Sequence, residues 1–341
     1  MAGYRVAILG ATGMVGREFI KILQQRNFPV SELILLASDR SAGKVVSFGQ
    51  RELVVQETSP DSFRGVDIVL ASAGAEISKE FSPIAASEGA VVVDNSRAFR
   101  MDPDTPLVVP EVNMEDAKGH KGIIANPNCS TIQMVVALNP IFKVNPIRRV
   151  IVDTYQAVSG TGSNAVDELM EQTRIALEGG SIEPKVYPHQ IGFSLFPHIE
   201  PFQENGYSRE EMKMLHETRK IMHAPDILVS ATAVRVPGPI GHSESIHNEL
   251  ERPMSPTEAR EILSKAPGVV VMDDPANDVY PTPAFAAGKD EVFVGRIRKD
   301  ISHPNGLAMW VVADNIRKGA ALNAVQIAEE LIKNDWLKGA R

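Results

Sequence analysis

Short runs of apolar residues, separated by segments with helical spacing, characterise the first third of the chain. The first run, residues 6–9, precedes apolar positions 15, 19, 22 and 23, which predicts a strand followed by an amphipathic helix. Five further strand-like runs lie at 33–37, 67–71, 90–93, 107–109 and 122–125. Runs that are apolar throughout indicate strands buried on both faces, as in a parallel sheet covered by helices. The pattern predicts a doubly wound, Rossmann-like domain.

The pattern changes after residue 130. A helical segment leads to Pro140, and a strand at 149–155 and a helix at 164–177 are expected next. The runs at 228–236, 245–251 and 292–299 alternate in polarity, which favours a mainly antiparallel sheet with one exposed face. These elements predict an α+β domain. The apolar stripe of residues 319–336 predicts a helix that docks on another part of the fold.

Composition supports two folded domains and narrows the possible partners. The chain has 341 residues, of which 43% are hydrophobic and 23% charged, an ordinary globular balance. A net charge of −8 gives no general attraction for nucleic acid or anionic lipid. Neither an export signal at residues 1–9 nor a run of about 18 apolar residues is found, so a cytoplasmic enzyme is expected.

A glycine-rich loop follows the first predicted strand. Residues 10–16 read GATGMVG and open the first helix. Glycines there permit a tight turn and close backbone approach, while the helix N-terminus offers N–H groups to a pyrophosphate. We predict a dinucleotide site with cofactor contacts at Gly10, Thr12, Gly13, Met14 and Val15.

The end of the second predicted strand bears on which dinucleotide binds. Asp39 could accept from a ribose 2′-hydroxyl and favour NAD. Arg40, flanked by Ser38 and Ser41, could instead hold a 2′-phosphate. NADP is the favoured prediction, because a guanidinium with hydroxyl neighbours suits a dianion better than a carboxylate does.

The single cysteine, Cys129, is either structural or reactive, because one thiol can form neither an intramolecular disulfide nor a multi-thiolate metal site. It lies between a predicted strand and an apolar helix. A helix N-terminus lowers a thiol's pKa and favours the nucleophilic thiolate. Buried, inert cysteine is the alternative. The nearby nucleotide loop favours a nucleophile that carries an acyl group as a thioester; no metal is expected.

Eight motifs, in chain order, together resemble the aspartate-semialdehyde dehydrogenase family. They are GATGMVG at 10–16, DNSRAFR at 94–100, PNCSTIQ at 127–133, TYQAVSGTG at 154–162, EEMK at 210–213, VRVPGPIGHSE at 234–244, FVGRIRKD at 293–300 and WVVADN at 310–315. The resemblance covers essentially the whole chain. It implies an NADP-binding domain at 1–128, a catalytic and dimerisation domain at 129–315, and a C-terminal helix, 316–341, that returns to the first domain.

The resemblance also implies roles for individual residues. Cys129 matches the nucleophile, His242 its acid/base partner, and Gln156 the glutamine that orients the substrate. The expected substrate ligands are Arg235 for the α-carboxylate, Glu210 for the ammonium group, Arg100 and Lys213 for phosphate, and Asn128 near the oxyanion or phosphate. Ser159, Gly160 and Asn315 match positions that meet the nicotinamide.

The activity implied is the NADP-dependent interconversion of L-aspartyl 4-phosphate and L-aspartate 4-semialdehyde through a Cys129 thioester. It would serve the biosynthesis of lysine, threonine, methionine and diaminopimelate. A homodimer or a dimer of dimers is expected. The nearest rival is an N-acetyl-glutamyl-phosphate reductase, whose acetylated substrate nitrogen would not call for a carboxylate such as Glu210.

Overall fold

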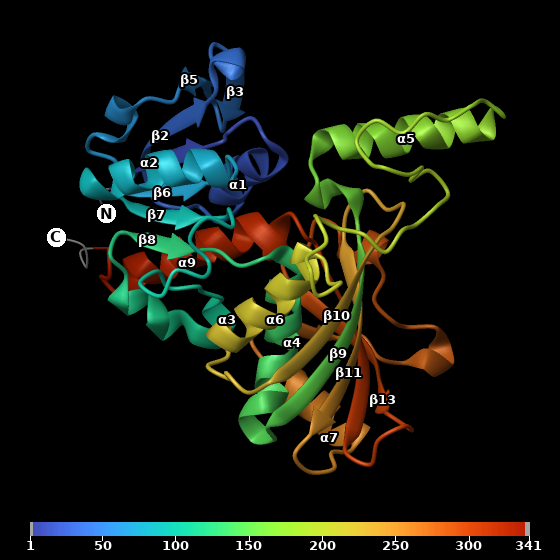
Figure 1. Ribbon diagram of the computed structural model, residues 1–341. Helices are drawn as coiled ribbons and strands as arrows, with labels where there is room; N and C mark the ends of the chain where they lie inside the picture. The colour runs from blue at the N-terminus through green and yellow to red at the C-terminus, as the bar shows by residue number, and fades with distance from the viewer. Residues whose placement is uncertain (1–2, 338–341) are drawn as a thin grey trace. The chain divides into compact units, whose positions relative to one another are not determined.

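The computed structural model describes residues 3–337 of the 341 in the chain. The chain forms two compact units (Figure 1). Unit 1 comprises Met1–Asn128 and Ala320–Arg341, and unit 2 comprises Cys129–Gly319. Of the C-terminal segment 316–341 predicted from sequence, residues 338–341 lie outside the described part.

Unit 1 is built on a six-stranded parallel sheet in the order β5-β2-β1-β6-β7-β8. Its strands are β1 (Tyr4–Leu9), β2 (Val30–Ala37), β5 (Gln56–Glu57), β6 (Ile68–Ala71), β7 (Val91–Asp94) and β8 (Ile123–Ala125). The chain switches direction of winding between β1 and β6, which is where nucleotides bind in doubly wound folds. The predicted Rossmann-like architecture is therefore confirmed.

Helices cover both faces of this sheet. They are α1 (Met14–Gln25), α2 (Ala75–Ser87), α3 (Pro110–Asn113) and α9 (Leu322–Lys333). One apolar core joins the sheet to α1 and α9, and a second joins the other face to α2. Because each strand is buried on both sides, its sequence is apolar throughout. A small hairpin, β3 (Val45–Phe48) and β4 (Arg51–Val54), was not anticipated from sequence.

The strand predicted at residues 107–109 is wrong. Only an isolated bridge forms there, between Leu107 and Ala125. Pro106 has no N–H to offer a neighbouring strand, and Pro110 begins α3 directly after Val109. The two prolines leave too short a segment for a regular ladder.

Unit 2 contains a mixed six-stranded sheet in the order β10-β9-β11-β14-β13-β12, part of which runs side by side in Figure 1. Its strands are β9 (Ile147–Gln156), β10 (Leu228–Arg235), β11 (His242–Leu250), β12 (Val269–Val271), β13 (Val292–Lys299) and β14 (Gly306–Ala313). The three central pairings are antiparallel, whereas β10 pairs with β9, and β12 with β13, in parallel. The mainly antiparallel sheet predicted from alternating polarity is confirmed.

Three helices of unit 2, α4 (Cys129–Val144), α6 (Arg209–Ile221) and α7 (Pro256–Leu263), lie on one face of this sheet. The short helix α8 (Pro283–Ala286) packs with Phe293, Val312 and Trp310 on the opposite face, and α5 (Ser163–Leu177) packs against the turn Val158–Gly160. Helix α4 continues through Pro140, and it is buried on nearly all sides, against the sheet and between α6 and α7. We call the face under α4 and α6 the inner face and the opposite one the outer face.

Candidate active site

The loop after β1 has the backbone that its glycines were predicted to provide. Gly10 has a φ of +91°, and a Cβ on it would lie 2.5 Å from the Ser72 carbonyl oxygen. A Cβ on Gly16 would collide with the Gly10 carbonyl. Gly13 caps the N-terminus of α1 with no side-chain hydrogen bond and is exposed. The first-turn amide groups at Met14 and Val15 therefore suit a pyrophosphate.

The loop after β2 approaches the same turn. Thr12 Oγ1 donates to Ser41 Oγ over 3.3 Å. Ser38 and Arg40 are exposed, and the Asp39 carboxylate accepts a 2.7 Å hydrogen bond from the Arg40 backbone. Lys44 Nζ, which sequence reasoning missed, donates to Ser41 Oγ over 3.3 Å. Two cations thus lie along a hydroxyl-bearing turn, which fits a 2′-phosphate.

Arg100 and Asn128 also belong to unit 1, and both are buried. The Arg100 guanidinium donates to the carbonyls of Asn126 and Asn95, each over 3.0 Å. These two hydrogen bonds fix the orientation of the guanidinium. Asp94, at the end of β7, is buried, which raises the pKa of its carboxyl, although hydrogen bonds from Ser96 and Ser78 and the charge of Arg100 oppose the rise.

Cys129 is the first residue of the 16-residue helix α4, as the sequence predicted. Its side chain is half-buried. The thiol lies at the positive end of a helix dipole, which favours thiolate. A Cβ on Gly319 would lie 2.9 Å from Cys129 Cβ, so glycine is needed where the π-helical segment Arg317–Ala321 passes the thiol. No pattern in the amino-acid sequence predicts this contact.

The register of the unit 2 sheet brings three predicted residues together on the inner face. Arg235, the last residue of β10, pairs with Gln156, the last of β9. His242 begins β11, next to the pairing of Ser243 with Tyr155. Arg235, Gln156 and His242 are all at least 96% buried. Predicting β11 to begin at 245, as the sequence pattern did, would have left His242 in a loop.

His242 is held as a neutral ring with its proton on Nε2. The Ala157 backbone N–H donates to Nδ1 over 3.1 Å, so Nδ1 is an acceptor. Burial and, next, the positive charge of Arg235 lower the pKa of His242 to about 3, against smaller opposing effects from Glu210 and the Gly241 carbonyl. Nε2 has no partner among the described residues. It is therefore a hydrogen-bond donor available to a bound carbonyl oxygen.

Arg235 is a buried guanidinium with part of its donor capacity unused. Nη1 donates to the Ala157 carbonyl over 2.6 Å, whereas Nε has no partner in the described part of the chain. Its guanidinium carbon lies 5.8 Å from the centre of the Tyr187 ring. A fixed guanidinium of this kind suits a carboxylate ligand.

A chain of polar contacts connects Gln156 to helix α6. Gln156 Nε2 donates to Glu210 Oε1 over 3.2 Å. Lys213 Nζ donates to Glu210 Oε2 over 2.9 Å and to Glu200 over 2.7 Å. The Glu210 and Lys213 side chains are only 5% and 14% exposed. This pair is therefore a buried part of unit 2 and not the solvated helical pair that such spacing usually indicates.

Ser159, Gly160 and Asn315 lie near His242. Asn315 Nδ2 donates to Ser159 Oγ over 2.9 Å, and Asn315 Oδ1 accepts from the Gly241 backbone over 2.8 Å. A Cβ on Gly160 would lie 3.5 Å from both His242 Nε2 and Arg235 Nη1. The absence of a side chain at Gly160 keeps the space beside these two groups open.

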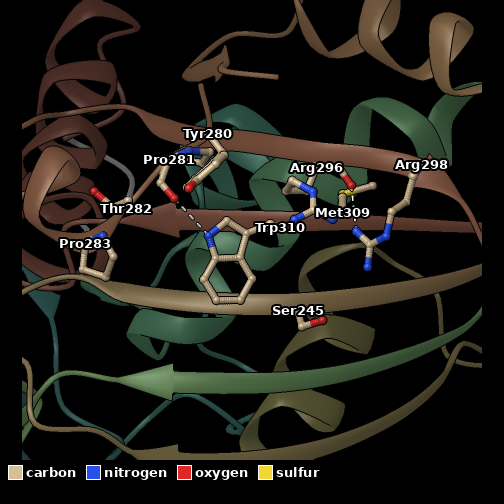
Figure 2. Close-up of a pocket in the computed structure, with 9 residues that line it drawn as sticks. All are labelled: Ser245, Tyr280, Pro281, Thr282, Pro283, Arg296, Arg298, Met309 and Trp310. Atoms are coloured by element: carbon tan, nitrogen blue, oxygen red, sulfur yellow. Dashed lines mark hydrogen bonds between the residues drawn. The ribbon is translucent and has the colours of Figure 1, made fainter. Parts of the chain in front are cut away.

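A cavity of about 330 Å³ lies at the outer face of the unit 2 sheet (Figure 2). Trp310 Nε1 donates to the Pro281 carbonyl over 3.0 Å at one side of it. Its lining residues are Ser245, Tyr280, Pro281, Thr282, Pro283, Arg296, Arg298, Met309 and Trp310. None of the residues predicted for catalysis or substrate binding lines it.

Candidate metal sites and membrane-spanning helices are both absent from residues 3–337. No group of three or more histidine, cysteine, aspartate or glutamate side chains there has an arrangement that could hold a metal ion. No helix in the same range is both long and apolar enough to cross a membrane.

Comparison with known families agrees with this division of the chain. Residues 5–120 match the NAD binding domain of semialdehyde dehydrogenase, and residues 138–318 match the semialdehyde dehydrogenase dimerisation domain. The protein is therefore an oxidoreductase of the semialdehyde dehydrogenase class.

Individual relatives narrow the family. The chain is 61% identical over 336 residues to aspartate-semialdehyde dehydrogenase of Aquifex aeolicus, covering 97% of this chain and 98% of the relative. It is 55% identical over 339 residues to the Bacillus subtilis enzyme of the same name, with 97% and 98% covered. The crystal structure of Vibrio cholerae aspartate semialdehyde dehydrogenase II complexed with ASA is similar at a TM-score of 0.96 and 48% identity, covering 98% and 99% of the two chains. The chain belongs to the aspartate-semialdehyde dehydrogenase family.

Proposed function

We propose that this protein interconverts L-aspartyl 4-phosphate and L-aspartate 4-semialdehyde, with NADP, through a thioester on Cys129. The observation that carries the substrate assignment is that unit 2 buries both a guanidinium, Arg235, and a carboxylate, Glu210. Arg235 offers a fixed guanidinium for an α-carboxylate, and Glu210 offers a carboxylate for a free ammonium group. An N-acetylated substrate has no ammonium group to match Glu210, so the reductase alternative fits less well.

The covalent steps follow from the position of the thiol. The Cys129 thiolate attacks the acyl carbon, the bond to phosphate breaks, and a thioester forms. After reduction, the tetrahedral alkoxide collapses, releases the aldehyde and regenerates the thiolate. Arg100, Lys213 and Asn128 bind the leaving phosphate in this proposal, and the proton that reduction consumes ends on that phosphate. Gln156 orients the substrate through its contact with Glu210.

His242 acts in this scheme as a hydrogen-bond donor to the reacting oxygen. Its Nε2 already carries a proton, and a second proton on Nδ1 would oppose the Ala157 N–H. Neither tetrahedral alkoxide needs a proton in order to collapse, so a neutral donor is sufficient. Thiolate formation then depends mainly on the N-terminus of α4, and His242 is not required as the base that removes the thiol proton.

NADP is the proposed cofactor. It supplies the hydride when bound, and a neighbouring structure, from Candida albicans, is titled as containing NADP, at 28% identity and a TM-score of 0.76 over 98% and 99% of the chains. The tight approach at Gly10 and Gly16 fits a pyrophosphate. Arg40, Lys44, Ser38 and Ser41 would bind the 2′-phosphate, and Ser159, Gly160 and Asn315 would meet the nicotinamide.

The domain roles and assembly are part of the same proposal. Residues 1–128 form the NADP-binding domain, and the helix of the 316–341 segment docks on it, since α9 shares the apolar core of α1 and the parallel sheet. Residues 129–315 carry catalysis and dimerisation. A homodimer through the outer face, or a dimer of such dimers, is supported by the dimerisation-domain match and by exposed apolar residues there, Ile151 and Leu228.

The proposed setting is the cytoplasmic biosynthesis of lysine, threonine, methionine and diaminopimelate. The pathway assignment rests on the family resemblance, which implies that the product, aspartate semialdehyde, is a precursor of these amino acids.

One assay tests the proposal. Purified protein is given aspartate semialdehyde or N-acetyl-glutamate semialdehyde, with phosphate and either NADP or NAD, before and after alkylation of its single thiol. We expect phosphate-dependent reduction of NADP with aspartate semialdehyde only, abolished by alkylation. Turnover that survives alkylation would contradict the thioester, and turnover of the acetylated substrate would favour the reductase.

A further inference from the structure

A buried carboxyl group, Glu244, lies directly below His242 on the inner face of β11. Residues two apart in a strand share a face, so the two side chains point to the same side of the sheet. Glu244 pairs across the sheet with Thr154 of β9 and with Val311 of β14. It is 0% exposed, and neither carboxyl oxygen has a hydrogen-bond partner among the described residues.

Helix α4 supplies the one polar side chain that acts on this carboxyl. Gln133, also 0% exposed, lies one helical turn after Cys129 and on the same side of α4. Burial raises the pKa of Glu244 well above its ordinary value, and among residues 3–337 the Gln133 side chain opposes the rise. A carboxyl group buried without a hydrogen-bond partner among the described residues favours its neutral form, which carries an O–H that can be donated.

The orientation of Gln133 complements this acid. Gln133 Nε2 points to the main-chain carbonyl of His242 over a long 3.5 Å contact, which leaves Oε1 to face another donor. Oε1 is buried and has no partner in the described part of the chain. If the Glu244 O–H donates to Gln133 Oε1, two polar groups that are costly to bury alone are paired.

We propose that Glu244 and Gln133 are a positioning pair, in which Glu244 donates to Gln133 Oε1 and Gln133 Nε2 donates to the His242 carbonyl. The pair ties the N-terminal part of the helix that carries Cys129 to the first residues of the strand that carries His242. It fixes the separation of the thiol and the imidazole without contacting the substrate. This inference rests on the proposed function for the roles of those two residues.

The test compares four variants of the full-length enzyme. Glu244→Gln keeps a donor of the same shape, Glu244→Met removes the donor at similar volume, and Glu244→Asp draws the carboxyl back by one methylene. Asn248→Leu is the matched control, because Asn248 is also a buried polar residue on the inner face of β11, with neither amide atom partnered in the described residues. The measurements are kcat, KM, melting temperature and the pH midpoint of Cys129 alkylation.

We expect Glu244→Gln to keep kcat within about twofold and Glu244→Met to lose tenfold or more in kcat, with KM nearly unchanged, since small displacements of reacting groups are costly. The alkylation midpoint should move in the Met and Asp variants and stay in place in the Gln and Asn248→Leu variants. If the Met variant does not fold, kcat and the alkylation midpoint of Glu244→Asp, the milder change, test the positioning pair.

Three results would overturn the pair. They are parental kcat and alkylation in the Met or Asp variant, an equal loss in Asn248→Leu, and a loss in Glu244→Gln as large as in Glu244→Met. Alkylation needs no substrate. A parent enzyme inactive on aspartate semialdehyde would therefore refute the proposed function, while the alkylation profiles would still decide the positioning pair.

Discussion

His242 owes its protonation state to its surroundings. An imidazole in water titrates near neutrality, but here burial and the Arg235 charge lower its pKa to about 3. The folded protein therefore keeps the ring neutral across the physiological range, while the unfolded chain protonates it below about pH 6.5. Its contribution to the free energy of unfolding is present above pH 6.5 and is lost as the pH falls from 6.5 towards 3.

The pH profile of activity should therefore not follow a histidine titration. Between pH 5.5 and 8.5, kcat/KM should show no histidine inflection near 6.5, and any inflection should follow Cys129 alkylation. His242→Asn should lower kcat by about 10²–10³, as expected for loss of one oxyanion donor. Steady-state kinetics across this range checks both statements. An inflection near 6.5 that disappears in His242→Asn would show instead that the ring titrates.

Gly160 provides a second prediction at the scale of one residue. Gly160→Ala should fold normally, because its methyl would meet its nearest neighbours at 3.5 Å, an ordinary contact distance. That methyl would lie in front of His242 Nε2, so we expect kcat/KM to fall by about one to two orders of magnitude. Gly119→Ala is the control, since a Cβ there meets nothing within 4 Å. Equal activity in both variants would mean that substrate does not use this space.

At the scale of elements, helix α6 carries two predicted substrate ligands on a well-defined start. Ser208 accepts from the Glu211 backbone, and the Glu211 side chain accepts from the Ser208 backbone, which forms a capping box. Glu211 also accepts from the Ala233 backbone of β10 over 2.9 Å. The cap therefore fixes the first turn, where Glu210 lies, against the strand that ends in Arg235.

We predict that Ser208→Ala lowers the free energy of unfolding by about 1 kcal/mol, the usual effect of losing an N-cap. It should also raise KM for aspartate semialdehyde more than it lowers kcat, because Glu210 would be less well fixed. Urea unfolding and steady-state kinetics measure the two effects. Ser255→Ala, which removes the N-cap of α7, is the control for loss of a cap elsewhere. A similar KM change in Ser255→Ala would show that the effect is not specific to the N-cap of α6.

At the scale of the whole molecule, the outer face of the unit 2 sheet gives the remaining prediction. Ile151 is 38% exposed and Leu228 is 55% exposed on this face, and exposed apolar patches often mark interfaces. Ile151→Glu should convert the proposed dimer to monomer, as measured by analytical ultracentrifugation. Ile301→Glu is the control, because Ile301 is fully exposed in a turn. A dimer that survives Ile151→Glu would place the interface elsewhere.

Local rules explain what could be read from the amino-acid order. Continuous apolar runs specified strands buried on both faces, the glycines of 10–16 specified a tight turn, and Cys129 was expected at a helix start because a strand-like run precedes it and an apolar helical pattern follows. The family resemblance supplied the residues that no periodicity could identify, including His242, Arg235 and Glu210. The fold class and the family follow from these features.

Other properties depend on residues distant in sequence and were decided only by folding. The Ala157 N–H sets the tautomer of His242 from 85 positions away in the chain. Gly319 approaches Cys129 from the other end of unit 2, and the pKa of Glu244 is raised because α4 and two strands exclude water from its carboxyl group. Sequence fixes residue types and local geometry, whereas protonation and close contacts depend on which groups the sheet register and helix packing bring together.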